Sequence, residues 1–219
     1  KIIKIGMPSA MQMFFEVALF TGAIWLCGMI GNTSQAANQI ALSLASMTFM
    51  FAMGLSVTAM IRIGNQKGLN DYVTLRKVAI SIFLLTIIIE VVFALLFVAL
   101  HTTLPYIFVD INDVKNLTEN LEVIAISANL LLVAAVFQIS DGLQVVVLGA
   151  LRGLQDAKIP MYITFVAYWV IGFPISIYLG LETELKAVGV WIGLLAGLTA
   201  AALFLYIRFN YLTKKLIKN

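Results

Sequence analysis

Three carboxylate residues stand inside long apolar stretches of this sequence, where acidic side chains are rare. They are Glu16, Glu90 and Asp141. A charged carboxylate at the centre of a membrane-spanning helix costs about 2.5 to 3.5 kcal/mol on an insertion scale. A chain that keeps such groups must pair them, hydrate them, protonate them or use them to bind a cation.

Glu16 and Asp141 each share a helical stripe with polar residues. Gln12 precedes Glu16 by four residues, and Gln138 lies three residues before Asp141. Residues at these spacings lie on one face of a helix, so both acids are expected to face the interior of a helix bundle. Glu90 shares its stripe with Phe83, Thr86, Ala94 and Phe97, and a packing role is expected for it.

The depth of the two acids can be compared. Glu16 follows Lys4 by 12 residues and Asp141 precedes Arg152 by 11. At 1.5 Å per residue, each lies about 16 to 18 Å from the side that holds these basic residues, close to the middle of a bilayer. The pattern predicts a shared site that accepts Na⁺ or H⁺, with no cofactor and no other metal. The alternative is a protonated acid that only hydrogen-bonds a neighbouring helix.

The elements that carry these acids are six apolar stretches. Of the 219 residues, 62% are hydrophobic and 11% are charged, against about 25% charged in soluble chains. Six segments have the roughly 20 apolar residues that a membrane span needs: 5–29, 36–61, 78–100, 121–148, 159–179 and 187–209. The composition predicts an all-α polytopic membrane protein. Gly172 and Pro174 predict a kink in the fifth span.

Basic residues set the expected topology. Twelve of the 14 Lys and Arg residues fall at the two termini and in the second–third and fourth–fifth connections. Positive charge concentrates on the cytoplasmic side of membrane proteins, so both termini are expected in the cytoplasm and the chain in the plasma membrane. The same charge bias explains the net charge of +3, and no nucleic-acid partner is expected.

Motifs of enzyme chemistry are missing from the sequence. It has no P-loop, no HExxH, no CxxC and no GxSxG, and its single histidine, His101, is far from both acids. We expect no enzyme activity. No Lys or Arg is placed in the middle of a span, which favours cationic cargo.

Several motifs, in order along nearly the whole chain, resemble the multidrug and toxic compound extrusion (MATE) family, NorM-like branch. They are Gly6-Met7-Pro8 with Phe14-Phe15-Glu16-Val17, Ala36-Ala37-Asn38-Gln39-Ile40, Arg62-Ile63-Gly64-Asn65-Gln66, Ser140-Asp141-Gly142-Leu143-Gln144, Gly149-Ala150-Leu151-Arg152-Gly153, and Tyr168-Trp169 with Gly172 and Pro174. The resemblance implies a twelve-helix antiporter of two six-helix lobes that expels organic cation drugs in exchange for Na⁺ or H⁺. This chain would be the C-terminal lobe, which agrees with its lack of an initiator methionine, and its partner the N-terminal lobe.

The resemblance also implies roles for particular residues. Glu16 and Asp141 match the cation site of NorM-like members, and Gln39 matches a glutamine of the substrate cavity. Further cavity or lid positions are Phe49, Phe137, Gln138, Asp110 and Asp113. Some relatives have a tyrosine near the cation site where this chain has Phe49 or Phe137, which leaves Na⁺ and H⁺ both open.

Three other functions are compatible with parts of the pattern. A lipid-linked oligosaccharide flippase of the same superfamily would need a cavity rich in Lys and Arg. An intramembrane aspartyl protease would need two aspartates, whereas one of the acids here is Glu16. In a structural membrane subunit, the acids would only join helices.

Overall fold

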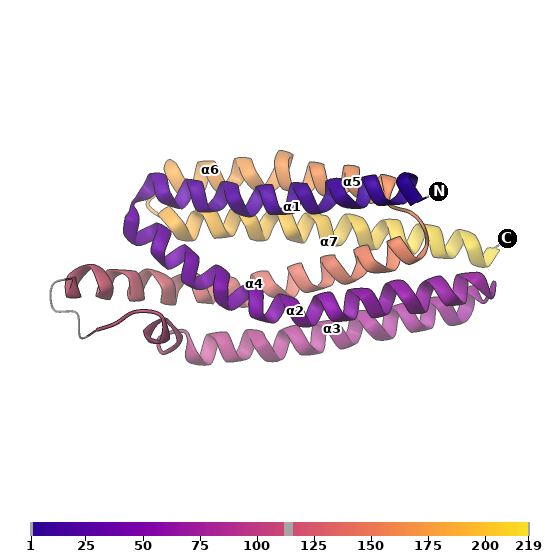
Figure 1. Cartoon of the computed structure of the whole chain (residues 1–219), viewed down its shortest axis with the longest axis horizontal. Helices are drawn as coiled ribbons and strands as arrows, with labels where there is room; N and C mark the ends of the chain where they lie inside the picture. Colours follow the sequence, from indigo (N-terminus) through magenta and orange to yellow (C-terminus); the bar gives the residue numbers. More distant parts are fainter. Residues whose placement is uncertain (1, 112–115, 219) are drawn as a thin grey trace.

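Helices form every regular element that the structure shows. This structure is a computed structural model, and it describes residues 2–111 and 116–218. No β-strand occurs in this part of the chain, and six apolar helical stretches are long enough to cross a membrane, as predicted. Their axes are roughly aligned with one another, and the two chain ends lie at the same end of the bundle (Figure 1).

The first three spans are continuous helices. They are α1 (Ile2–Ile30), α2 (Asn32–Gly68) and α3 (Tyr72–Leu100). A single residue, Gly31, separates α1 from α2. Asp71 caps the start of α3, because its carboxylate accepts a hydrogen bond from the backbone N–H of Thr74 at 3.0 Å.

The second half of the chain contributes the other three spans. A short 3₁₀ helix, η1 (Leu104–Ile107), precedes the long helix α4 (Leu117–Gly153). The fifth span is a run of three helical pieces, and the sixth is one helix. These elements are α5 (Lys158–Phe165), η2 (Val166–Gly172), α6 (Phe173–Leu181) and α7 (Lys186–Lys218).

The break in the fifth span coincides with the glycine and proline that predicted a kink. The piece Val166–Gly172 is a π-helix, and Pro174 follows as the second residue of α6. Proline has no N–H to donate to the preceding turn, and a wider π turn accommodates such a gap. Gly172 also lies against Gly197 of α7: a Cβ on Gly172 would come within 3.0 Å of the Gly197 Cα.

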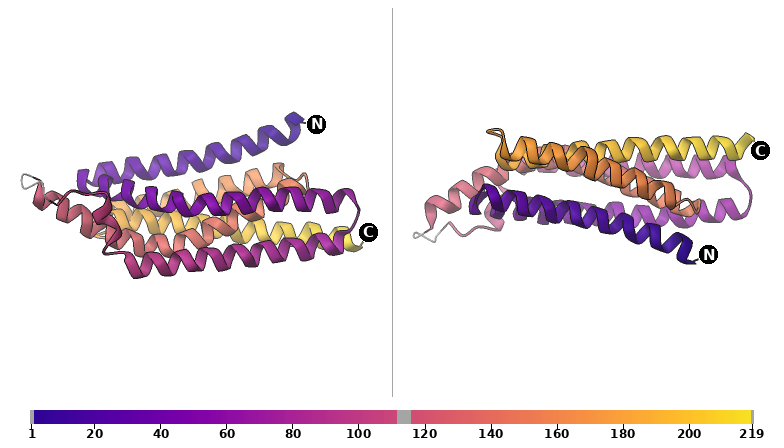
Figure 2. Two further views of the ribbon diagram at one scale, coloured as in Figure 1. Left: turned by 60° about the horizontal axis from the view of Figure 1, so that its bottom comes forward. Right: turned by 90° about the horizontal axis from the view of Figure 1, so that it is seen from above.

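Helix α4 occupies the middle of the bundle. It packs against α2, α3 and α7, whereas α1 lies along one edge (Figure 2). The α2–α4 contact is close. The hydroxyl of Ser56 donates to the carbonyl of Val145 at 2.7 Å, and Gly149 lies directly against Ser56. Small residues at such positions let two membrane helices approach each other.

Helices α2 and α4 are longer than the segments predicted from hydropathy. Each has 37 residues, whereas the predicted spans were 36–61 and 121–148. The additional residues are polar ends such as Asn32–Gln35 and Asn65–Lys67. A hydropathy criterion stops where the apolar stretch stops, but a helix continues until its backbone is capped.

Candidate functional site

A cavity of about 400 Å³ lies between α1, α2 and α4. This volume falls within the range of small-molecule binding sites, and the lining is mostly apolar. The lining residues are Met13, Glu16, Val17, Phe20, Thr21 and Ile24 of α1, Gln39, Leu42, Ala45, Ser46, Phe49 and Met53 of α2, and Phe137, Asp141, Val145, Leu148 and Arg152 of α4.

Both predicted acids line this cavity, from two different helices. Glu16 extends from α1 and is half-buried, whereas Asp141 extends from α4 and is 6% exposed. The Oδ1 atom of Asp141 is buried and has no hydrogen-bond partner in the structure. The charges of the two carboxyl groups interact across the cavity. The site therefore contains a buried carboxyl oxygen, Oδ1 of Asp141, that can still bind a cation or accept a hydrogen bond.

Arg152 is the unexpected residue of the cavity. The sequence placed it in a basic connection outside the spans, and none of the basic residues was expected inside the membrane. In the structure the guanidinium lines the cavity, and its Nη2 donates to Oε1 of Gln12 at 3.2 Å. Its Nε is buried without a hydrogen-bond partner, and its charge interacts with that of Glu16.

Gln12 holds Arg152 in this orientation. The side-chain amide of Gln12 donates to the backbone carbonyl of Ala157 at 3.0 Å, while its oxygen accepts from Arg152. Gln12 is buried, so α1 is attached at this level to the end of α4 and to the connection that follows it. The stripe that includes Gln12 and Glu16 faces the bundle interior, as predicted.

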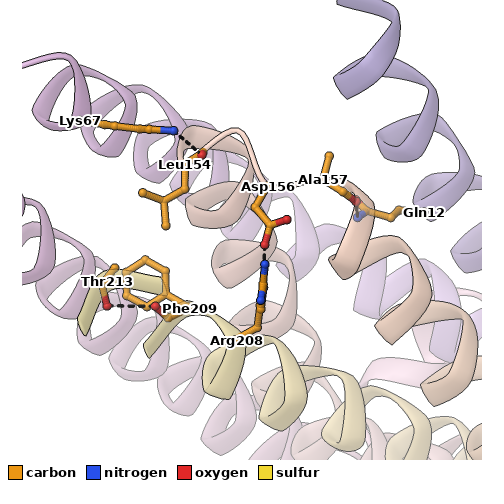
Figure 3. A network of polar contacts seen from close by, with 8 residues as sticks. All are labelled: Gln12, Lys67, Leu154, Asp156, Ala157, Arg208, Phe209 and Thr213. Carbon is orange, nitrogen blue, oxygen red and sulfur yellow. Dashed lines mark hydrogen bonds and ion pairs between the residues drawn. The ribbon is translucent and has the colours of Figure 1, made fainter. Parts of the chain in front are cut away.

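The same connection is anchored from two further helices (Figure 3). Lys67 of α2 donates to the carbonyl of Leu154 at 2.6 Å, and Arg208 of α7 forms an ion pair with Asp156 at 2.8 Å. Residues 154–157 thus join α1, α2 and α7 at one end of the bundle. This network closes the end of the lobe next to the arginine of the cavity.

Aromatic and amide side chains form the walls of the cavity. Phe20 and Phe137 meet edge to face with ring centroids 6.1 Å apart, and Phe137 packs on Trp191 at 5.1 Å. The indole N–H of Trp191 donates to the side-chain oxygen of buried Asn38 at 2.8 Å. These contacts fix the Phe137 ring and the helical turn that presents Gln39 to the cavity.

The predicted site residues therefore divide into two groups. Glu16, Gln39, Phe49, Phe137 and Asp141 line one cavity. The structure places the others elsewhere: Gln138 is buried away from the cavity, Asp110 is exposed in the connection after η1, and Asp113 lies outside the described residues.

The third intramembrane acid, Glu90, packs behind the cavity. It is 1% exposed, and its Cγ and Oε1 lie against Gly142, so that a Cβ on this glycine would be 2.7 and 2.8 Å from these two atoms. Its Oε2 is buried without a hydrogen-bond partner. Glu90 contributes no lining atom to the cavity, although its charge interacts with that of Asp141.

Sequence reasoning missed Arg152, and a signal for it was present. Asp141, Val145, Leu148 and Arg152 follow at intervals of four, three and four residues, which places them along one stripe of α4. The stripe from Asp141 thus leads directly to the arginine. Among the described residues, no group of three His, Cys, Asp or Glu side chains is arranged to hold a metal ion.

Comparisons with known proteins point to one family. The sequence pattern of the MatE family matches residues 8–178. The probable multidrug resistance protein NorM of Agrobacterium fabrum is 36% identical over 218 residues, which is all of this chain and 46% of that protein. The protein of the same name from Acinetobacter baylyi is 39% identical over 209 residues, covering 95% of this chain and 44% of its own length.

The fold comparison agrees with the sequence comparison. The crystal structure of the eukaryotic MATE transporter AtDTX14 superposes with a TM-score of 0.84 over 98% of this chain and 47% of that one, at 20% identity. This chain thus spans about half the length of the relatives it matches. Its six spans are the fold of one half of such a transporter, and the chain belongs to the MatE family of multi-pass membrane transporters.

Proposed function

We propose that this chain is the C-terminal six-helix lobe of a multidrug efflux antiporter that exports organic cations and is driven by Na⁺ or H⁺. The observation that carries the proposal is the shared cavity of Glu16 and Asp141. Intramembrane carboxylates mark ion pathways in transporters, and here two of them line one mostly apolar cavity. The names of the sequence relatives support the efflux of drugs.

Charge counting gives the cavity a preference for cations. Glu16 and Asp141 contribute two negative charges when ionised, and Arg152 contributes one positive charge, so the net charge is −1. One Na⁺ or one H⁺ neutralises this site. An organic cation is attracted to the same charge and can stack on the partly exposed Phe20 ring.

Coupling follows when the ion and the drug favour different arrangements of the two lobes. A ligand shifts a conformational equilibrium only by its difference in affinity for the two states. Neutralising Glu16 and Asp141 removes the attraction for a cationic drug, so ion binding promotes drug release. This lobe supplies one wall of the transport path and the second lobe supplies the other. Both termini of the chain lie on the cytoplasmic side of the plasma membrane, by the distribution of its basic residues.

The flippase alternative requires a cavity that holds a pyrophosphate group. Arg152 is a basic residue in the right place, but two carboxylates outweigh its charge. A pyrophosphate would be repelled by the net negative charge, so this cavity favours export of cations.

The test of the proposal is drug efflux by the transporter that contains this chain, expressed in cells that lack their own exporters. Asp141→Asn and Glu16→Gln should each reduce ion-driven efflux by at least tenfold, because each removes a charge that binds the coupling ion. The matched control is Glu119→Gln, which removes an exposed acid in the first turn of α4. Unchanged efflux in Asp141→Asn would overturn the proposal.

A further inference from the structure

A second pocket lies between α3 and α7 and shares no lining residue with the cavity of Glu16 and Asp141. It is a shallow groove of about 550 Å³ at the end of the bundle that carries both chain termini. Its lining residues are Arg76, Tyr206, Ile207, Asn210, Tyr211 and Lys214. Two of the six are cationic and none is acidic.

Arg76 is held in a fixed position, and no carboxylate among the described residues forms an ion pair with it. Its Nη1 donates to the hydroxyl of Thr213 at 3.1 Å, and its Nη2 donates to the side-chain oxygen of Asn210 at 2.7 Å. Both acceptors are uncharged oxygens. The guanidinium is half-buried, so its position is defined while its charge is not neutralised by the protein. A fixed guanidinium fork suits a phosphate or carboxylate group.

A second cation lies on the same stripe of α7. Lys214 follows Asn210 by four residues, and its side chain is exposed. Asp156 does not neutralise the charge of the groove, because this carboxylate is already paired with Arg208. The groove therefore presents two positive charges to its occupant.

The groove lies at the level of lipid headgroups. Arg76 is in the second turn of α3, about 6 Å from the first residue of that helix. Helix α7 has 33 residues, or about 50 Å, and exceeds a hydrocarbon core of about 30 Å, so its last turns reach the interface. Tyr206 and Tyr211 are exposed here, as tyrosines are at membrane interfaces.

The surface above the groove is apolar. Ile80 lies one turn beyond Arg76 on α3, and Leu203 and Ile207 precede Asn210 on α7; all three side chains are exposed. Such a surface suits acyl chains. The cations thus stand directly below a surface that favours hydrocarbon.

We propose that the α3–α7 groove binds the phosphate of an anionic phospholipid headgroup, with Arg76 and Lys214 as its ligands and the acyl chains along Ile80, Leu203 and Ile207. Basic pockets between membrane helices on the cytoplasmic side are suited to anionic lipids. This lipid site does not depend on which ion or drug the transporter carries.

Lipid retention measured by native mass spectrometry tests this proposal. The whole transporter that contains this chain is purified in detergent and titrated with phosphatidylglycerol, phosphatidylcholine or inorganic phosphate. The unsubstituted protein should bind phosphatidylglycerol at least tenfold more tightly than phosphatidylcholine. Arg76→Gln and Lys214→Gln should each weaken phosphatidylglycerol binding by about fivefold. Lys214 is exposed, so its replacement tests the site even if Arg76→Gln impairs folding.

The matched control is Arg62→Gln, which removes an exposed cation of α2 outside the groove. It should leave binding unchanged. An equal loss in Arg62→Gln would show diffuse attraction to the basic end of the protein and overturn the proposal. Equal binding of the two lipids would do the same. Competition by inorganic phosphate at micromolar concentration would replace the lipid with a soluble anion as the occupant, and so would also overturn it.

Discussion

Arg152 of α4 and Glu16 of α1 line the same cavity, although the first stands at the end of a span in the sequence and the second in the middle of one. Gln12 bridges the two helices by accepting from Arg152 and donating to Ala157. The Arg152 side chain lines the cavity, and its charge interacts with that of Glu16. The proposed ion site therefore contains a cation of its own.

Removing this internal cation should strengthen ion binding. In Arg152→Gln the cavity retains two acids without a counter-charge. A like charge about 10 Å from a bound ion costs about 1.7 kcal/mol at an effective dielectric constant of about 20, so Na⁺ affinity or proton affinity should rise roughly 15-fold. Arg152→Lys keeps the charge and should bind ions nearly as the unsubstituted protein does. Isothermal titration of the purified transporter with Na⁺, repeated at several pH values, measures both quantities.

The control for this experiment is Arg62→Gln, because Arg62 is an exposed cation of α2 that lines no part of the cavity. Weaker ion binding in Arg152→Gln, at unchanged thermal stability, would mean that Arg152 orients the acids instead of competing with the ion.

Gly149→Ala should disrupt the α2–α4 contact. A Cβ on Gly149 would overlap the backbone carbonyl and the hydroxyl of Ser56, and neither helix can retreat without breaking the Ser56–Val145 hydrogen bond. The expected cost is about 2 to 4 kcal/mol of unfolding free energy, the range of overpacked cores and broken buried hydrogen bonds. The control is Gly54→Ala, since a Cβ there would meet no atom within 4 Å. Thermal unfolding followed by tryptophan fluorescence compares the two, and equal melting temperatures would contradict the prediction.

Much of the fold was predictable because the membrane imposes a simple rule on the sequence. Apolar stretches of about 20 residues must be helices, and the six expected spans are present. The boundaries of α2 and α4 were less accurate, since polar residues such as Asn32 and Lys67 extend a helix into water without any hydropathy signal. Gly172 and Pro174 marked the position of an irregular turn, but nothing in the sequence distinguished a π-helical piece from a simple bend.

The site was predictable to the extent that residues were unusual for their surroundings. Glu16 and Asp141 are conspicuous in apolar helices, and the structure brings them to one cavity. Arg152 was missed because a basic residue at the end of a span is ordinary as a topology signal. Its position on the helical stripe of Asp141 was the sequence signal that could have placed it in the cavity. Gln138 shares a stripe with Asp141 but is buried away from the lining, since helical spacing fixes a face only approximately.

The N-cap of α3 should give the protein a pH-dependent increment of stability. Hydrogen bonds from Thr74, first from its side chain and then from its backbone, lower the pKa of Asp71 from its ordinary value of 3.8. A carboxyl group with a lowered pKa stabilises the folded state above its unfolded pKa, and this contribution disappears as the pH falls through the folded value. The increment should therefore be complete at pH 7, begin to decline near pH 4 and disappear as the pH falls through the lowered folded pKa.

Melting temperatures of two Asp71 variants between pH 3 and 7 measure this increment. Asp71→Ala should melt lower than the unsubstituted protein at pH 7, and the difference should shrink toward pH 3. Asp71→Asn keeps a capping oxygen and should fall between them. Glu122→Gln removes an exposed acid of α4 and serves as the control. A difference for Asp71→Ala that stays constant across this pH range would exclude the carboxylate as its source.

Two substitutions of Glu90 distinguish a packing role of this residue from a role in ion transport. Its carboxyl group lies against Gly142 behind the cavity and adds no lining atom, so Glu90→Gln, which keeps the shape and removes the charge, should retain efflux within about twofold of the unsubstituted transporter. Glu90→Ala should instead lower the free energy of unfolding by about 1 to 3 kcal/mol, because it leaves a void beside Gly142. Efflux and melting temperature, measured beside Asp141→Asn, distinguish these effects. Loss of ion-driven efflux in Glu90→Gln at an unchanged melting temperature would instead make Glu90, through its interaction with Asp141, a third member of the ion pathway.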